Sequence, residues 1–123
     1  MKQSLALSFA AVIGATALAG SAAARPAAPV PSTVTISAAA VGLKYTTTLV
    51  KAKAGRIKIV FANPSPLQHN IRFESGETEL GGTKTIGKGK TTAFVTLKPG
   101  KYHFYCSVPG HEAAGMQGYI VVS

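Results

Sequence analysis

The stretch YCSVPGHEAAGM, residues 105–116, places three side chains that can bind a metal in one short segment. Cys106 is the only cysteine of the chain, His111 follows it by five residues, and Met116 follows His111 by five. Taken alone, a cysteine is commonly a small buried residue and a methionine a filler of gaps in a core. Thiolate and thioether sulfur suit Cu(I), and imidazole suits Cu(II). The presence of all three side chains in one short segment therefore predicts a copper site.

A fourth ligand is expected from an upstream strand. His69 opens the stretch HNIRFE, residues 69–74, where strand alternation places it on the same face as Ile71 and Phe73. The same alternation turns Cys106 inward at the end of the strand that follows Pro99-Gly100. Two histidines, one cysteine and a weak axial methionine are the ligand set of a mononuclear blue-copper electron-transfer site. The predicted ligands are His69, Cys106, His111 and Met116.

The same residues argue against an enzyme. No acid–base pair and no open water position accompany the predicted ligands. A multicopper oxidase or a nitrite reductase needs further copper centres that three histidines cannot supply, and a dinuclear copper domain needs two cysteines. Two rivals to an electron carrier stay open, namely a copper-carrying or buffering protein with similar ligands and a metal-free structural module.

The elements that must position these residues are short strands. β-branched residues and period-two alternation, interrupted by Gly and Pro, predict an all-β sandwich or barrel. The expected strands cover residues 33–41, 44–50, 54–63, 69–74, 91–97 and 100–106, with a last one beginning near 118. The Gly- and Lys-rich segment 77–90 is expected to be a loop with a weak strand near 84–86, and a turn is expected near 112–115.

The beginning of the chain predicts export. Lys2, an apolar run and the small residues Ala22 and Ala24 form the pattern of a secretory signal peptide, here residues 1–24. The run is short and broken by Ser, Thr and Gly, which argues against a membrane anchor. Residues 25–32 are expected to be a Pro/Ala-rich lead-in and residues 33–123 one domain. We therefore expect a periplasmic protein.

The charge predicts anionic partners. The whole chain carries a formal net charge of +9, and removal of Lys2 with the signal peptide leaves +8. Such a surface attracts anionic partners, and we expect an acidic redox protein or an anionic membrane face rather than nucleic acid. The chain itself is expected to be a monomer. A candidate docking patch comprises Lys84, Lys88, Lys90, Lys98 and Lys101.

The stretches PGKYHFYCSVPGHEAAGMQGYIVV and HNI resemble a cupredoxin of the plastocyanin, auracyanin and rusticyanin kind. The resemblance implies a Greek-key β-sandwich and a copper ion held by the four residues named above. It also implies that the Asn70 side chain bonds to the residue after the cysteine, Ser107. The spacing Cys-x₄-His-x₄-Met is more similar to rusticyanin and auracyanin than to plastocyanin, whose gap between cysteine and histidine is shorter.

The expected function is a single-electron shuttle that uses one copper ion. The ring of His111 is expected to reach the surface within an apolar rim made of Pro66, Leu67, Pro109, Ala113 and Ala114. His103 and Tyr105 point away from Cys106 by alternation and are interpreted as surface packing. The alternatives kept for them are a second metal role for His103 and a second electron route for Tyr105.

Overall fold

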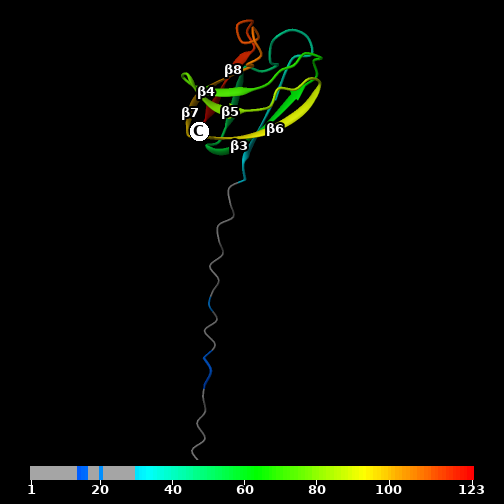
Figure 1. Cartoon of the computed structure of the whole chain (residues 1–123). Helices are drawn as coiled ribbons and strands as arrows, with labels where there is room; N and C mark the ends of the chain where they lie inside the picture. Colours follow the sequence, from blue (N-terminus) through cyan, green and yellow to red (C-terminus); the bar gives the residue numbers. More distant parts are fainter. Residues whose placement is uncertain (1–13, 17–19, 21–29) are drawn as a thin grey trace, which may run out of the picture.

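A computed structural model describes residues 14–16, 20 and 30–123 of the chain. The predicted signal peptide (1–24) and lead-in (25–32) therefore lie largely outside the described residues. Eight strands follow one another along the chain (Figure 1). They are β1 (Ser32–Ser37), β2 (Leu49–Ala52), β3 (Gly55–Asn63), β4 (Arg72–Ser75), β5 (Thr78–Gly82), β6 (Gly89–Leu97), β7 (Gly100–Tyr105) and β8 (Gln117–Val122).

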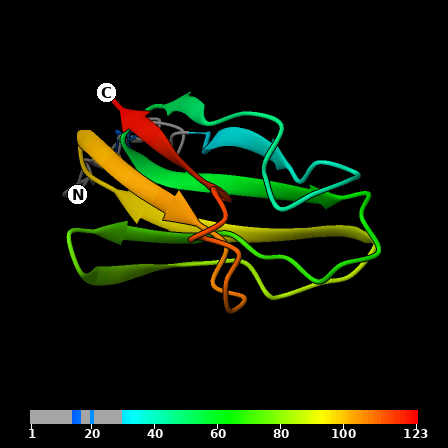
Figure 2. The ribbon, with the colours of Figure 1, turned by 90° about the horizontal axis from the view of Figure 1, so that it is seen from above.

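The strands form two sheets. The first has the order β1-β3-β6 and the second the order β2-β8-β7-β4-β5. β1 lies parallel to β3 and β2 parallel to β8, whereas the remaining pairs are antiparallel. The long strands β3 and β6 run side by side along the domain (Figure 2). Neighbours in each sheet are often distant in sequence, as in a Greek-key sandwich, so the predicted fold is confirmed.

The core lies between the two sheets and follows the predicted alternation. On β3, Ile57, Ile59 and Phe61 are fully buried, and Phe104 of β7 is buried on the facing sheet. Burial of each such side chain stabilises the fold by about 1.5–3 kcal/mol. This apolar layer continues up to the end of β7, where the fully buried Cys106 follows directly.

Several expectations about individual elements were wrong. β5 lies inside the segment 77–90 that was expected to be a loop, and β2 begins at Leu49 rather than at residue 44. Glycine residues suggested a loop here, but one of them, Gly82, allows β5 to lie close to its neighbour. At Gly82, which has a φ of +154°, a Cβ atom would overlap the carbonyl oxygen of Ile71 in the neighbouring chain segment. The expected weak strand near 84–86 is reduced to one isolated bridge between Ile86 and His69.

The described residues contain no helix that is long and apolar enough to cross a membrane. The turn that joins β7 to β8, orange to red in Figure 1, stands at one end of the sandwich. It includes the stretch from which three of the predicted ligands come.

Candidate metal centre

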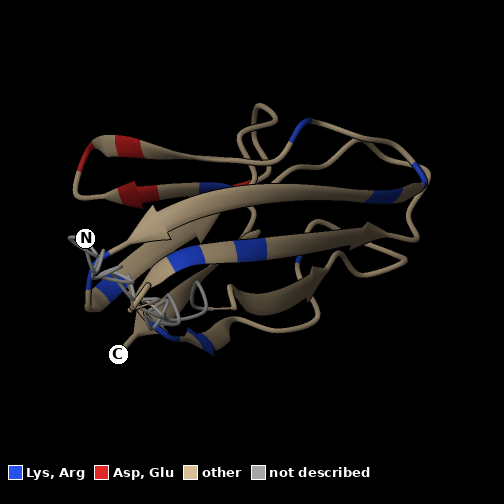
Figure 3. Ribbon diagram, turned by 90° about the horizontal axis from the view of Figure 1, so that it is seen from below, with Lys and Arg blue, Asp and Glu red and all other residues tan. Residues whose placement is uncertain are grey.

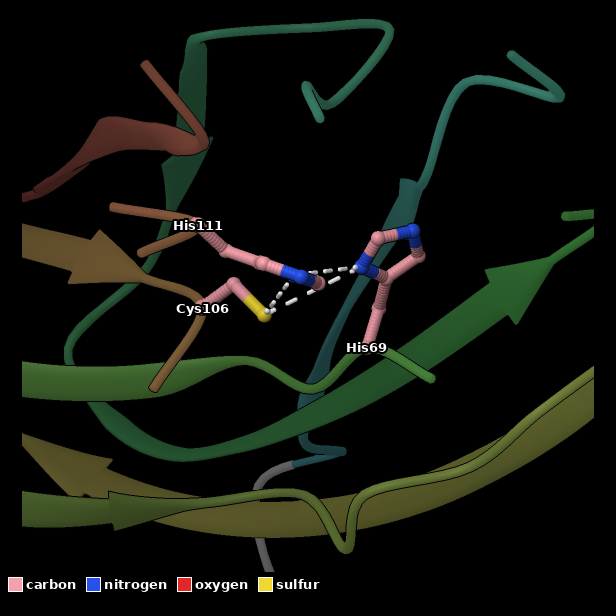
Figure 4. Close-up of side chains that lie close together, drawn as sticks. All are labelled: His69, Cys106 and His111. Atoms are coloured by element: carbon pink, nitrogen blue, oxygen red, sulfur yellow. Dashed lines mark hydrogen bonds between the residues drawn. The ribbon is translucent and has the colours of Figure 1, made fainter. Parts of the chain in front are cut away.

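Three predicted ligands meet at this end of the sandwich. His69, Cys106 and His111 each offer one ligand atom, and these atoms all lie within 4.8 Å of one another. Cys106 Sγ lies 3.5 Å from His111 Nδ1 and 3.9 Å from His69 Nδ1, and the two Nδ1 atoms are 3.1 Å apart. The three side chains point toward one another from different segments (Figure 4). Sequence reasoning had placed them together, and the structure does so.

The β7–β8 turn owes its shape to its own backbone. Cys106 N donates to Met116 O at 3.1 Å, so the residues before and after the turn are held together. Inside the turn, His111 N donates to Val108 O at 3.0 Å, and Met116 N donates to His111 O at 3.0 Å. Met116 is fully buried where the turn enters β8. These backbone hydrogen bonds use none of the metal-binding side-chain atoms. They therefore hold Cys106, His111 and Met116 close together in space by themselves.

His69 is held separately. Its backbone pairs with Ile86 in both directions, with N···O distances of 3.0 and 2.9 Å. It does not belong to β4, which begins at Arg72, so the expected strand 69–74 starts later than predicted. The loop before it is shaped by Asn63, whose side-chain amide donates to Leu67 O and Ile86 O at 2.8 and 2.9 Å. Sequence reasoning missed this role, although Asn before Pro64 is a recognisable turn signal.

Asn70 joins the two ligand segments. Its Nδ2 donates to Ser107 Oγ at 2.7 Å and to Thr85 Oγ1 at 2.9 Å, and its Oδ1 accepts from Ser107 N at 2.8 Å. The Asn70–Ser107 link implied by the resemblance is confirmed. The buried Tyr45 adds a hydrogen bond from its hydroxyl to Asn70 O, which no local pattern indicated. Hydrogen bonds of this outer layer orient metal ligands and fix their geometry.

The electrostatics favour the metal-binding forms of the side chains. Burial lowers the pKa of His69, and the nearby His111 lowers it further. The neutral imidazole is the form that ligates a metal. Burial also raises the pKa of Tyr45, with a smaller contribution from Cys106, so its hydroxyl keeps the proton that it donates to Asn70. Thiolate, thioether and two imidazoles are the donors that suit copper, so the residues present fit one copper ion.

Exposure differs sharply among the predicted ligands. His69, Cys106 and Met116 are fully buried, whereas His111 is partly exposed. The predicted apolar rim around it is solvent-exposed, and Leu67 alone exposes 46% of its surface. The imidazole of His111 is thus the link between the buried donors and the surface.

The candidate lysine patch does not form one surface. Lys90 lies near the beginning of β6 and Lys98 just after its end, so the five lysines are divided between opposite ends of that long strand. Lys84 and Lys88 flank Ile86, which pairs with His69, and they lie at the end of the predicted copper site. Three of the four acidic residues, Glu74, Glu77 and Glu79, lie in the β4–β5 hairpin (Figure 3).

The chain was compared with known proteins. It matches the model of the family described as copper binding proteins, plastocyanin/azurin family, over residues 32–123. Plastocyanin A/B of Petroselinum crispum is 32% identical over 90 residues, which cover 67% of this chain and 90% of the relative. The copper-containing nitrite reductase of Rhizobium meliloti (strain 1021) is 36% identical over 76 residues, which cover 54% of this chain and 20% of the relative.

A solved structure resembles the domain as well. Reduced auracyanin from Roseiflexus castenholzii matches it with a TM-score of 0.70 and 27% identity, covering 77% of this chain and 99% of that one. The chain spans less than half the length of several curated relatives that it matches, including the nitrite reductase. The family match nevertheless extends over every strand of the sandwich. The chain therefore belongs to the plastocyanin/azurin family of copper-binding proteins.

Proposed function

We propose that this protein is an exported single-electron carrier that binds one copper ion through His69, Cys106, His111 and Met116. The observation that carries the proposal is the convergence of two Nδ1 atoms and one thiol sulfur within 4.8 Å. Met116 is fully buried, and its backbone is hydrogen-bonded to Cys106 and His111. When bound there, copper supplies a Cu(II)/Cu(I) couple that needs no other cofactor.

The chain's own residues keep the site in one geometry. Asn70 holds the His69 segment and the Cys106 segment together. Within the β7–β8 turn, backbone hydrogen bonds tie Met116 to Cys106 and to His111. These bonds do not involve the donor atoms, so they persist in both oxidation states. Burial of His69, Cys106 and Met116 excludes water from the donors. A site that moves little on a change of charge suits rapid electron exchange.

His111 is proposed to be the exit for the electron. It is the one partly exposed member of the predicted ligand set, and it lies within an exposed apolar rim that contains Leu67 and Pro109. A small apolar rim supports short-lived docking, which a shuttle requires because it must leave each partner. Lys84 and Lys88 at the same end would attract an acidic redox partner, and this attraction would weaken with salt.

An electron carrier is favoured over an enzyme and over a copper buffer. The relatives include plastocyanins, and also a copper-containing nitrite reductase of which this chain spans one fifth. The proposal assigns the four donors to one site, and of the three histidines of the chain only His103 is left outside it. A buffering protein would release Cu(I) readily, whereas the donors here are mostly buried and held by backbone bonds.

The proposed location is the periplasm, and the proposed active form is a monomer beginning at Arg25. The support is the signal-peptide pattern of residues 1–24, which precedes a domain proposed to cover 33–123. Expression in a bacterial host, followed by fractionation and N-terminal sequencing of the exported chain, tests this part. Recovery of the uncleaved chain in the cytoplasm would contradict it.

The central test is a visible absorption spectrum of the copper(II)-loaded mature protein, recorded before and after ascorbate. An intense band toward the red that bleaches on reduction and returns on oxidation is expected from a thiolate–copper bond. Cys106→Ser removes the thiolate and should abolish the band. A faintly coloured wild-type protein that still binds copper would favour the buffering function, and a Cys106→Ser variant that stays intensely blue would overturn the ligand assignment.

A further inference from the structure

A second group of ligating side chains lies on the outer face of the five-stranded sheet. Glu74 on β4 and His103 on β7 are directly opposite each other in the antiparallel register. Glu112, in the turn that precedes β8, brings a second carboxylate to them. One ligand atom from each of the three residues lies within 4.8 Å of the other two. This group is separated from Cys106 by the sheet itself, because Phe104 and Cys106 are buried and His103 is on the opposite side of β7.

The surroundings of His103 indicate a place for a cation. Its Nδ1 lies 2.7 Å from Glu74 Oε1, and its Nε2 lies 2.7 Å from the side-chain oxygen of Gln117. The Gln117 amide nitrogen is turned the other way, toward Glu112 O at 3.4 Å. A neutral imidazole carries one N–H and donates to only one of the two oxygens, whereas a protonated ring donates to both. In the neutral form the other ring nitrogen has a lone pair directed at an oxygen, and that nitrogen can bind a cation.

The imidazole is also held in place. Its ring stacks on Tyr105 with a centroid distance of 5.6 Å and an interplanar angle of 11°, and Tyr119 packs on it at 5.4 Å. The side chains of His103 and Glu74 expose only 17% and 22% of their surface. Restricted ligands of this kind lose little freedom when they bind an ion.

The local charge favours a cation although the chain as a whole is strongly basic. The chain has only four acidic residues, and two of them are members of this group. A third, Glu79 on β5, pairs with Arg72 on the adjacent strand β4, and Glu77 lies in the turn between these two strands. Carboxylates within a few ångströms act on a bound ion more strongly than distant, screened lysines.

From these contacts we propose that Glu74, His103 and Glu112 form a second metal site, for a divalent ion of the Zn(II) or Cu(II) type. One imidazole nitrogen and two carboxylates suit such ions, whereas Ca²⁺ and Mg²⁺ prefer oxygen ligands alone. A solvent molecule completes a four-coordinate shell. The site is independent of the copper-binding function proposed above, since it shares none of those side chains.

Titration of Zn(II) into the reduced, copper-loaded protein tests the site, with the histidine ring signals followed separately by NMR. The His103 signals are expected to shift with a saturable curve. In the copper-free protein the same shift is expected after Zn(II) has filled the empty His69–Cys106–His111 cluster, because thiolate and imidazole donors also bind Zn(II). A His103 signal that does not respond to Zn(II) in either form of the protein overturns the proposal, whatever the copper site does.

Equilibrium dialysis with metal analysis of matched variants locates the ligands. Glu74→Gln and His103→Phe, which keeps a ring to stack on Tyr105, should each weaken this Zn(II) binding at least about 10-fold, the loss typical of even an outer-layer partner. Glu77→Gln removes the same charge from a residue outside the group. It should change the Zn(II) affinity less than about twofold, because exposed and screened charges contribute little. Equal weakening by Glu77→Gln and Glu74→Gln would mean general attraction to the acidic face and no site. Far-UV circular dichroism verifies that each variant is folded.

Discussion

Asn70 and Ser107 are joined by two hydrogen bonds, one from the Asn70 amide nitrogen to the Ser107 hydroxyl at 2.7 Å and one from the Ser107 backbone to the Asn70 oxygen at 2.8 Å. Each residue is the immediate neighbour of a proposed ligand, His69 in one case and Cys106 in the other. The pair therefore connects two segments that are 37 residues apart in the sequence. It fixes the spacing of the imidazole and the thiol from outside the metal site.

Replacement of Asn70 by Ala is expected to loosen both segments. The change leaves the Ser107 amide without its acceptor in a part-buried hydrogen bond, and the loss of such a bond costs about 0.5–1.5 kcal/mol. Thermal or denaturant unfolding of the copper-free protein should show this loss, and copper affinity should fall about 10–100-fold. Thr85→Val, which removes only the Asn70–Thr85 bond, is the control and should have a smaller effect on both. Equal effects of the two variants would show that Ser107 is not the important partner.

Met116→Leu is expected to retain a coloured copper site with a higher reduction potential. The leucine keeps the apolar volume of a fully buried side chain but removes a weak sulfur donor to Cu(II). Cyclic voltammetry together with the visible spectrum measures both properties. Loss of copper altogether would instead indicate that Met116 is required for the structure of the turn.

The copper-free protein should lose stability as the pH falls from about 7 through about 6, partly because of His69. The pKa of His69 is lowered in the fold, chiefly by burial, so the unfolded chain takes up a proton that the folded chain does not. Stability contributed by this residue is thus present above its ordinary pKa of about 6.5 and declines below it. Urea unfolding of wild type and His69→Gln at pH 7.5 and 5.5 tests this, and an identical pH response of the two proteins would refute it.

Gly82→Ala should destabilise the protein, because the new methyl group would overlap the Ile71 carbonyl oxygen and the residue has a φ of +154°. Strained backbone of this type costs about 1–3 kcal/mol. Gly87→Ala is the matched control, since nothing lies within 4 Å of the position that its Cβ would take. Denaturant unfolding compares the two variants. A stable Gly82→Ala protein would mean that β5 can move away from β4.

The lysines at the two ends of β6 should differ in their effect on electron transfer. Lys88 lies near the Ile86–His69 bridge. Because hexacyanoferrate(III) is an anion, Lys88→Glu should slow its oxidation of the reduced protein at low salt. Lys98→Glu makes the same change in charge at the other end of β6 and should slow this oxidation less. Stopped-flow rates at several salt concentrations decide the matter. Equal slowing by both would indicate an effect of net charge alone.

The proposed copper ligands could be predicted because the signal is local. Cys106, His111 and Met116 lie in one turn, and alternation along short strands placed Cys106 inward and His103 outward. The roles of Tyr45 and Asn63 could not be predicted, because their partners Asn70, Leu67 and Ile86 are set by how loops meet in space.

Strand boundaries were predicted less well than strand identity. β5 was missed because glycine ordinarily favours loops, whereas Gly82 is required there by the close approach of the neighbouring chain segment. A second metal role for His103 was kept as an alternative, but its partners Glu74 and Glu112 could not be predicted from the sequence. The group depends on the register of β4 against β7, which no local pattern specifies.

The parallel pairing of β2 with β8 has a consequence for the maturation of the protein. β2 is the edge strand beside β8, which is the last strand in the sequence and follows the β7–β8 turn, so this edge of the sheet depends on the same part of the chain as the donor cluster. Long-range pairing of this kind is slow to form. Because backbone bonds hold the turn without metal, the chain is expected to finish folding first and to receive copper afterwards. Delivery of the metal, rather than its capture by a nascent chain, is then the final step of assembly.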